Sequence, residues 1–362
     1  MNKIVRFLLI LLVSCIIFTG HVAASGDFWT EKAPLPLGEG GLGAAVVNEK
    51  IYVFGGFAAN IGILNTTEEY DPATNTWISR APMPVPGIGW GVTVCQNKIY
   101  AINGTVNEVY DPTTNTWENR KPMPTERESL QANAVGNKIY LIGGMLNVPP
   151  RGEIFGVTEV YDPSSDSWTT LASMPYPVNR YASAVIDGKI YIFGGSTSSD
   201  QTSTLVQIFD PETNNWTTGA PMPAAVFGGA AAATTGVFAP KRIYVIGGSD
   251  SDLNQIYDPE NNSWTFGAPM PTARLGLAVA VMNDTLYAIG GNSGFELPGI
   301  IYDANEQYTP LGYGTLSSPS PSPLPSPSVP EFSTQMLNVL IVTFVASTAV
   351  AAIVRKKIVL ND

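Results

Sequence analysis

A short apolar segment recurs six times along the chain and constrains its fold more than any other feature. From Trp29 to Trp264 the repeat takes 235 residues over five steps, a mean period of 47. A repeat of this length is one supersecondary unit that buries its apolar faces only against its neighbours. The six copies align without gaps: KIYVFGG (50–56), KIYAING (98–104), KIYLIGG (138–144), KIYIFGG (189–195), RIYVIGG (242–248) and TLYAIGG (285–291).

The interior of each repeat predicts a four-stranded antiparallel sheet. The β-branched and aromatic segment bounded by glycines is typical of a buried strand. The motif aromatic-Asp-Pro-x-x-Asn predicts a hairpin turn, in which Asn75 and its equivalents tolerate the left-handed region. A tryptophan follows seven residues after each aromatic residue. Five repeats carry this motif, at Tyr70, Tyr110, Tyr161, Phe209 and Tyr257.

These motifs and their period resemble the kelch repeat over about residues 27–311. The resemblance implies an all-β fold, a six-bladed kelch β-propeller, whose loop face commonly binds partners. Repeat 2 departs from the pattern with Asn103-Gly104 in place of Gly-Gly. In repeat 6 we interpret Tyr302-Asp303-Ala304 as the aromatic motif, with Tyr308 where the tryptophan would stand.

The chain also predicts how the ring closes. The segment from Trp29 to Pro36 resembles the segment from Trp264 to Pro271, so we expect strand 27–33 to complete the last blade. Tyr308 to Leu311 would then leave the sheet. Alternatively, Tyr308 supplies that strand and Trp29 packs outside the ring.

Both ends of the chain resemble targeting segments. Residues 1–24 have the charged start, apolar stretch and small-residue exit of a signal peptide, with cleavage after Ala24. A lipoprotein-like box ending at Cys15 is the rival cleavage site. The propeller would occupy residues 25–313 and a Pro/Ser-rich stalk residues 314–332. Residues 333–354 are expected to form a transmembrane helix, followed by a basic cytoplasmic tail at 355–362.

Pro330, Glu331 and Phe332 precede this apolar segment and resemble an archaeal-type C-terminal sorting signal. Cleavage near this motif by a membrane sortase and a plain anchor that is never cut are both open. Either arrangement predicts a secreted, membrane-anchored protein with its folded domain on the cell surface.

Composition excludes several classes of function. The net charge of −11 argues against a nucleic-acid binder, which needs a basic face. The single histidine, His21, lies in the predicted leader, so the mature chain would lack histidine-ligated metals and histidine-based catalytic sets. We therefore expect no cofactor, no metal site and no enzymatic activity.

Candidate binding residues fall on the loop face. The loops after the glycine pairs carry Phe57, Arg151, Glu153 and Phe155. Arginines before the innermost strands, together with Glu39, are expected to surround the mouth of the central channel: Arg127, Arg180 and Arg274. They could clamp a carboxylate, because arginine forms bidentate pairs with carboxylates. The structural alternative is that each arginine pairs with a carboxylate of a neighbouring blade or with backbone carbonyls.

The resulting functional prediction is a non-catalytic surface module that binds a protein or glycan partner. One alternative is a sugar-active enzyme, sialidase-like or sialic-acid-isomerising, with Glu39, Glu153 or Glu296 as acid or base. Another alternative is a structural component of the cell envelope. Sequons predict glycosylation at Asn65, Asn103, Asn215, Asn261 and Asn283.

Overall fold

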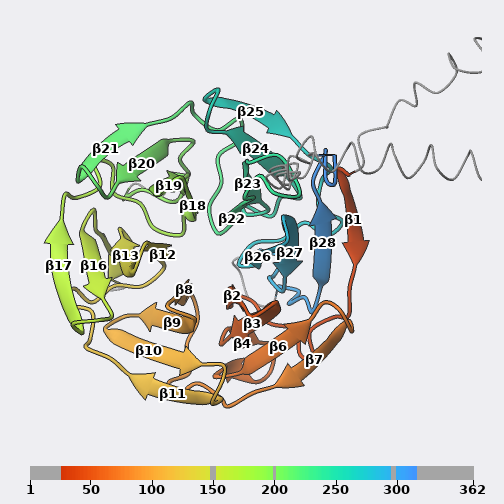
Figure 1. Ribbon diagram of the computed structural model, residues 1–362, viewed down its shortest axis with the longest axis horizontal. Helices are drawn as coiled ribbons and strands as arrows, with labels where there is room; N and C mark the ends of the chain where they lie inside the picture. The colour runs from red at the N-terminus through yellow and green to blue at the C-terminus, as the bar shows by residue number, and fades with distance from the viewer. Residues whose placement is uncertain (1–25, 147–151, 199–200, 295–298, 316–362) are drawn as a thin grey trace, which may run out of the picture. The chain divides into compact units, whose positions relative to one another are not determined.

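Six four-stranded antiparallel sheets, here called blades 1 to 6, form a ring around a central channel in the computed structural model (Figure 1). The structure describes residues 26–146, 152–198, 201–294 and 299–315. The predicted all-β six-bladed propeller is confirmed. Within these ranges no helix has the length and apolar character needed to cross a bilayer. Residues 1–24, the sorting motif, the expected span 333–354 and the tail lie outside the described residues.

Each blade runs from an inner strand at the channel to an outer strand at the rim. Blade 1 contains β2 (Gly43–Val47), β3 (Lys50–Phe54), β6 (Thr67–Asp71) and β7 (Thr76–Ser79). Blade 2 contains β8 (Gly91–Cys95), β9 (Lys98–Asn103), β10 (Val106–Asp111) and β11 (Thr116–Asn119). Blade 3 contains β12 (Ala132–Val135), β13 (Lys138–Ile142), β16 (Thr158–Asp162) and β17 (Ser167–Leu171).

The remaining blades follow the same order. Blade 4 contains β18 (Ala182–Ile186), β19 (Lys189–Phe193), β20 (Val206–Asp210) and β21 (Asn215–Thr218). Blade 5 contains β22 (Ala230–Ala233), β23 (Ile243–Ile246), β24 (Asn254–Asp258) and β25 (Ser263–Phe266). Blade 6 contains β26 (Ala278–Met282), β27 (Thr285–Ile289), β28 (Asn305–Thr309) and β1 (Phe28–Glu31). Two small hairpins, β4 (Phe57–Ala58) with β5 (Gly62–Ile63) and β14 (Met145–Leu146) with β15 (Glu153–Ile154), project from blades 1 and 3.

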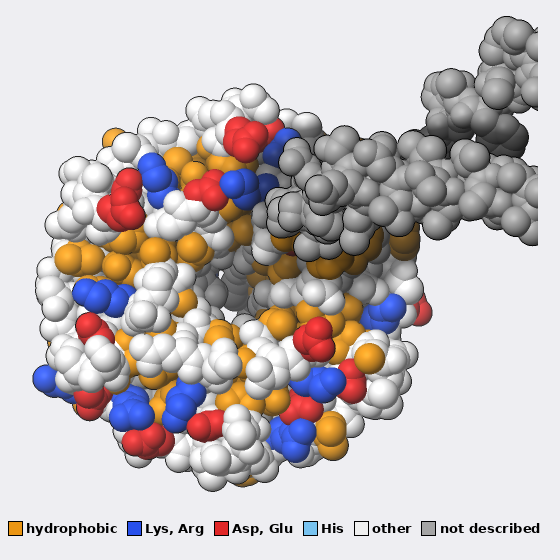
Figure 2. Space-filling model, viewed as in Figure 1, with side chains coloured by type: hydrophobic (Ala, Val, Ile, Leu, Met, Phe, Trp, Pro, Cys, Tyr) orange, Lys and Arg blue, Asp and Glu red, His pale blue; other side chains and the backbone are white. Residues whose placement is uncertain are grey.

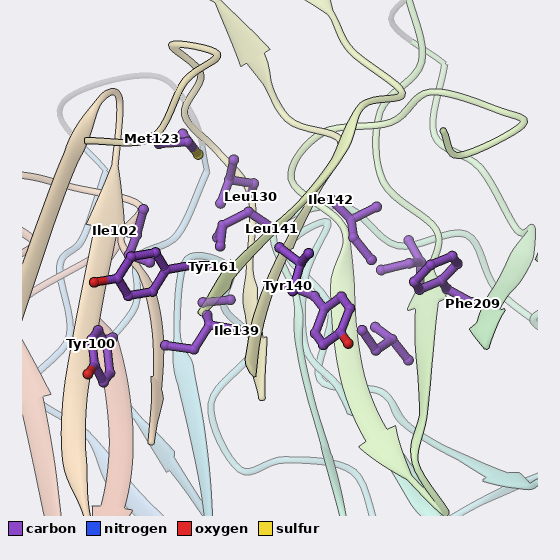
Figure 3. Close-up of a cluster of buried hydrophobic side chains, with 14 of the residues drawn as sticks. Tyr100, Ile102, Met123, Leu130, Ile139, Tyr140, Leu141, Ile142, Tyr161 and Phe209 are labelled. Carbon is purple, nitrogen blue, oxygen red and sulfur yellow. The ribbon is translucent and has the colours of Figure 1, made fainter. Parts of the chain in front are cut away.

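The hydrophobic core lies between adjacent blades. The second strand of each blade is apolar on both faces because both faces pack against neighbouring sheets. In Figure 3, side chains of blades 2, 3 and 4 meet in one such cluster. Tyr100 of blade 2 lies 6.0 Å from Tyr161 of blade 3, and Tyr140 of blade 3 lies 6.2 Å from Phe209 of blade 4 (ring centroids). These aromatic contacts join consecutive blades.

The hairpin residues that the repeats share also tie neighbouring blades together. In blade 1, Asn75 has a φ of 56°, as the sequence predicted. Its Oδ1 accepts hydrogen bonds from the Tyr70 hydroxyl (2.6 Å) and from the amide of Ala33, in the segment entering the blade (2.8 Å). Trp77 Nε1 donates to the carbonyl of the same Ala33 at 2.9 Å. The six equivalent tryptophans make this bond at the same distance: Trp29, Trp77, Trp117, Trp168, Trp216 and Trp264.

The last blade is assembled from both ends of the described chain. Strand β1, red in Figure 1, pairs with β28, in blue, and places Trp29 opposite Tyr308. The pair has the register of Trp77 opposite Tyr70 in blade 1. Tyr308 is therefore the aromatic residue of the sixth hairpin motif. Our interpretation of Tyr302-Asp303-Ala304 as that motif, and of Tyr308 as a tryptophan substitute that leaves the sheet, is wrong.

Candidate functional site

The central channel opens into a depression on the loop face, which is the candidate binding site. The inner strands enclose a cavity of ≈ 270 Å³ along the channel. At its mouth lies a wider depression of ≈ 550 Å³. We call this the mouth depression. Its lining includes Gly40–Leu42, Phe57, Ile63, Ile88–Trp90, Glu128–Gln131, Arg180–Tyr181, Gly228–Gly229, Leu275–Leu277, Asn292, Gly294, Gly299 and Ile301.

A chain of backbone hydrogen bonds stiffens the rim of the mouth depression. One residue per blade adopts a left-handed conformation there, with φ between 50° and 69°: Gly41, Gly89, Ser129, Arg180, Gly228 and Gly276. Five amide-to-carbonyl bonds of 2.7–2.9 Å connect these residues from blade to blade. Glycine suits four of the six positions because it reaches positive φ without steric penalty. The rim is therefore mostly bare backbone, and side chains project into the depression from residues beside it.

One side of the mouth depression is apolar. Phe57 and Ile63 pair across the β4–β5 hairpin, and Ile88 follows from the segment before β8. Ile63 and Ile88 are 55% and 43% exposed, so these aliphatic side chains face solvent. Ile301 of blade 6 lines the same depression. Phe57 thus lies where the sequence predicted a contact residue, whereas the isoleucines were not predicted.

Arg127 and Arg274 do not reach this surface. Both side chains have no exposed area. Arg127 pairs with Glu159 and donates to the carbonyls of Thr125, Leu141 and Gly143. Arg274 repeats the pattern in blade 6, with 2.7 Å to Glu306 and bonds to the carbonyls of Thr272, Ala288 and Gly290. The prediction that these two arginines contact a partner is wrong, because their donors are used within their own blades.

Arg180 is not equivalent to these two residues, so the predicted arginine set is also wrong. The second glycine of each glycine pair, or Gly104 in blade 2, donates its amide to the residue that holds the Arg127 position in the following blade. The acceptors define the true set: Glu39, Gly87, Arg127, Val178, Val226 and Arg274. Arg180 lies two residues after Val178. It is exposed and lines the mouth depression.

Glu39 is a buried carboxyl rather than a surface one. Only 1% of the residue is exposed, and Oε1 accepts a hydrogen bond from Thr66 Oγ1 at 3.0 Å. Oε2 has no hydrogen-bond partner among the described residues. Burial, with a contribution from the Glu68 carboxylate, raises the pKa of Glu39 to about 7. The prediction that Glu39 forms part of a partner-binding face is therefore wrong.

Blade 2 holds a second buried carboxyl of this kind. Glu108 has no exposed area, and burial raises its pKa to about 7. It occupies the strand position of Glu159, but Gly87 stands where blade 3 has Arg127. A Cβ on Gly87 would lie 2.6 Å from Trp90 Nε1, so the Trp90 indole fills the space beside Gly87. Trp90 is buried and packs in the core.

The remaining predicted contact residues lie elsewhere. Glu153 is an exposed residue of β15, and Phe155 follows it; neither is among the described residues that line the mouth depression. Arg151 and Glu296 lie outside the described residues. No group of three or more His, Cys, Asp or Glu in the described ranges is arranged to hold a metal ion. The sugar-active alternative needed an arginine clamp, and Arg127 and Arg274 cannot supply it in these positions.

The predicted sequons differ in accessibility. Asn215, Asn261 and Asn283 are exposed on turns or strand ends. Asn65 is also exposed, although its Nδ2 donates to the Met83 carbonyl at 3.0 Å. Asn103 is half-buried, and its Nδ2 donates to the Ile88 carbonyl at 3.0 Å. Glycosylation of Asn103 would therefore require this hydrogen bond to break.

The charged side chains seen in Figure 2 are mixed in sign. On the face that Figure 2 shows, acidic and basic groups lie beside one another around the ring, and the channel opens as a hollow at its centre. Between residues 25 and 330 the chain carries 14 basic and 28 acidic residues, a net charge of −14. A net negative charge of this size repels polyanions and disfavours nucleic-acid partners.

Comparisons with known proteins agree with this architecture. A family model described as the KLHDC2/KLHL20/DRC7 Kelch-repeats domain matches residues 89–291, and the Kelch motif model matches residues 40–84. A solved structure of YjhT superposes with a TM-score of 0.63 at 16% identity, covering 75% of this chain and 95% of that one. At this identity the likeness concerns the fold alone.

Similar curated proteins share only short segments. Alpha-scruin of Limulus polyphemus is 46% identical over 50 residues, which is 14% of this chain and 5% of scruin. Influenza virus NS1A-binding protein homolog B of Danio rerio is 43% identical over 54 residues, 15% of this chain and 8% of that protein. The matched segments thus span less than a tenth of these relatives.

Proposed function

Because the chain belongs to the kelch-repeat family, we propose that it is a non-catalytic binding module whose mouth depression receives a protein partner. The family match fixes the propeller scaffold, and this scaffold hosts many functions, so the site itself must carry the functional argument. One similar protein is named as a binding protein, which agrees with an interaction role without identifying a partner for this chain.

The observation that carries the proposal is the exposed aliphatic wall beside a rigid backbone rim. Ile63 and Ile88 leave about half of their surface in water while they line the mouth depression. Burying such surface stabilises a complex by about 25 cal/mol per Å². Residues at the centre of a concave, well-packed site carry most of the binding energy in protein interfaces. A partner that inserts an aliphatic or aromatic side chain into the depression would therefore gain most of its affinity here.

We further propose that the module is displayed outside the cell. The support is the sequence pattern of a leader at 1–24, a Pro/Ser-rich stalk and an apolar segment at 333–354 followed by basic residues. Anchoring by that segment, with or without cleavage near Pro330-Glu331-Phe332, would leave the propeller in the extracytoplasmic space. Fractionation of cells expressing the full chain, with protease added from outside, tests this placement.

Selection of displayed peptides on the purified full chain tests the binding site. We expect the selected peptides to contain an apolar anchor residue and to lose about tenfold or more in affinity on Ile88→Asp, since a charge would enter an apolar contact. The matched control is Ile78→Asp, because Ile78 is 50% exposed on β7, the outermost strand of blade 1, and does not line the mouth depression. Equal binding to both variants, or equal loss in both, would contradict the proposed site.

A further inference from the structure

Blade 5 differs from the other blades in the turn between its first two strands. Five blades join these strands with two residues, at 48–49, 96–97, 136–137, 187–188 and 283–284. In blade 5, nine residues (234–242) separate β22 from β23. We call this segment the blade 5 loop. The backbone N–H and C=O groups of this longer loop need hydrogen-bond partners. These partners identify the parts of the molecule that the loop contacts.

The first partner is a buried carboxylate of blade 6. Asp284 lies in the two-residue turn after β26 and is 1% exposed. Its Oδ1 accepts bonds from the amide (2.6 Å) and hydroxyl (2.9 Å) of Thr235. Its Oδ2 accepts the amides of Val237 (3.0 Å), Phe238 (2.7 Å) and Ala239 (3.1 Å). Burial alone would raise the pKa of Asp284, but these donors outweigh it and hold the pKa below its usual range. The carboxylate therefore fixes the conformation of the loop.

The loop is also tied to blade 4. Lys241 Nζ forms an ion pair of 2.8 Å with Asp187, in the equivalent turn of that blade. Both groups are substantially exposed, so this pair contributes little to stability. It nevertheless places the base of the loop between the turns of its two neighbours.

The second partner of the loop is the end of the described chain. Residues 310–315, here called the exit segment, follow β28 directly. The Phe238 ring stacks on Tyr313 with centroids 6.1 Å apart and an interplanar angle of 22°. The amide of Gly314 donates to the Phe238 carbonyl at 2.7 Å. A Cβ on Gly312 would lie 3.3 Å from the ring of Pro240, so the exit segment packs against this proline side chain.

The same exit segment contacts the start of the described chain. The amide of Asp27 donates to the Thr309 carbonyl at 2.7 Å. Gly26 has a φ of 122°, and a Cβ there would lie 1.9 Å from the Pro310 carbonyl oxygen. Only glycine fits this contact. The exit segment is thus held between the blade 5 loop and the residues that lead into β1.

We propose that the blade 5 loop is a latch for ring closure, which holds the exit segment so that β1 and β28 stay paired when the exit segment is pulled. Without the latch, opening would begin at Thr309, whose partner in β1 is Phe28. With the latch, the aromatic stack and the Gly314 bond must break first. This inference does not depend on the proposed binding function. It concerns the blade 5 loop, blade 6 and the exit segment, and none of the residues on the apolar side of the mouth depression: Phe57, Ile63, Ile88 and Ile301.

Hydrogen exchange followed by mass spectrometry on the full chain tests the latch. In Phe238→Ala we expect the β1 and β28 amides to exchange about tenfold faster than in the wild type, since local opening becomes easier. The amides of blade 2 should keep their rates. Phe266→Ala is the matched control, because Phe266 is a phenylalanine on β25 of the same blade that is 56% exposed, against 44% for Phe238.

Tyr313→Ala tests the same contact from the exit segment, where no strand is altered. It should reproduce the faster exchange of β1 and β28. Unchanged exchange of β1 and β28 in both Phe238→Ala and Tyr313→Ala would overturn the proposal. So would an equal increase in blade 2, because that result would indicate a general loss of stability rather than a local latch.

Discussion

At the scale of single residues, a pair of positions in each blade explains where the arginines point. The first position, held by Arg127 in blade 3, precedes the inner strand. The second, held by Glu159 in blade 3, lies two residues before the aromatic residue of the hairpin motif. Blades 3 and 6 combine Arg with Glu in an ion pair, whereas blades 4 and 5 combine Val with Gln. In blade 5, the Gln255 amide bonds both the amide and the carbonyl of Ala224 instead. The arginines therefore serve the blades rather than a ligand.

This pairing makes a prediction for blade 6. Arg274→Val leaves the buried Glu306 without its cation, and we expect a loss of about 3–5 kcal/mol in the free energy of unfolding. Adding Glu306→Gln copies blade 5 and should recover at least half of that loss. Urea unfolding measures both variants. A double variant no more stable than Arg274→Val would contradict this account of the pair.

Blades 1 and 2 lack the arginine and keep buried carboxyls, which predicts an unusual pH dependence. Burial raises the pKa of Glu108 to about 7, so the folded protein favours the protonated form. Protonated Glu108 therefore contributes stability to the folded protein. This contribution is complete below about pH 4.5, the ordinary pKa of a glutamate, and is lost as the pH rises through about 7. Since the only histidine is His21, few other groups titrate in this window.

We expect Glu108→Gln to reduce the fall in stability between pH 5.5 and pH 8 by about 2 kcal/mol, because the glutamine has no proton to lose. The remaining slope belongs largely to Glu39, whose pKa is raised in the same way. Urea unfolding at the two pH values measures the effect. Glu212→Gln is the control, because Glu212 is an exposed residue of a blade 4 turn. If Glu108→Gln keeps the wild-type slope, the carboxyl is ionised in the folded state.

At the scale of strands and hairpins, sequence and structure agree wherever the repeat is continuous. Five hairpins place their aromatic, Asn or Asp, and Trp residues as the motif predicted. For the sixth, the sequence predicted that strand 27–33 completes the blade, but it misplaced the aromatic residue because the hairpin is split between the two ends of the described chain. Tyr308-Thr309-Pro310 supplies the aromatic half, and Asp27 with Trp29 supplies the other half. The blade 5 loop was also missed, since spacing alone does not show what an insertion contacts.

Asp27 should therefore behave as the missing turn residue of the sixth hairpin. Its φ is 64°, and its Oδ1 accepts the Tyr308 hydroxyl at 2.8 Å and the Ala268 amide at 2.5 Å. Asp27→Ala loses both bonds at a left-handed position and should lower stability by about 1–2 kcal/mol. Asp27→Asn keeps an oxygen acceptor, as four other blades do, and should remain close to the wild type. Equal losses in the two variants, measured by thermal or urea unfolding, would show that the oxygen acceptor is unimportant.

At the scale of the whole ring, the repeat period predicts the propeller but not the chemistry of its mouth. Six equivalent sheets must close on themselves to bury both faces of every second strand, so the fold follows from the periodicity. The mouth depression depends instead on details that vary between blades. The β4–β5 hairpin brings Ile63 to the mouth, whereas Phe155 of the corresponding blade 3 loop lies outside its described lining. Sequence alone could not distinguish these two loops, because both are long and carry a phenylalanine.

We propose that a protein partner occupies the apolar side of the mouth depression. The most direct measurement is photo-crosslinking on intact cells, with a photoreactive phenylalanine analogue at position 63 and, as a matched control, at position 78. Both positions hold half-exposed isoleucines of blade 1, but only the first lines the depression. We predict a discrete protein adduct from position 63 that Ile88→Asp abolishes, and none from position 78. Adducts of the same size from both positions, or an adduct that Ile88→Asp leaves unchanged, would contradict the claim.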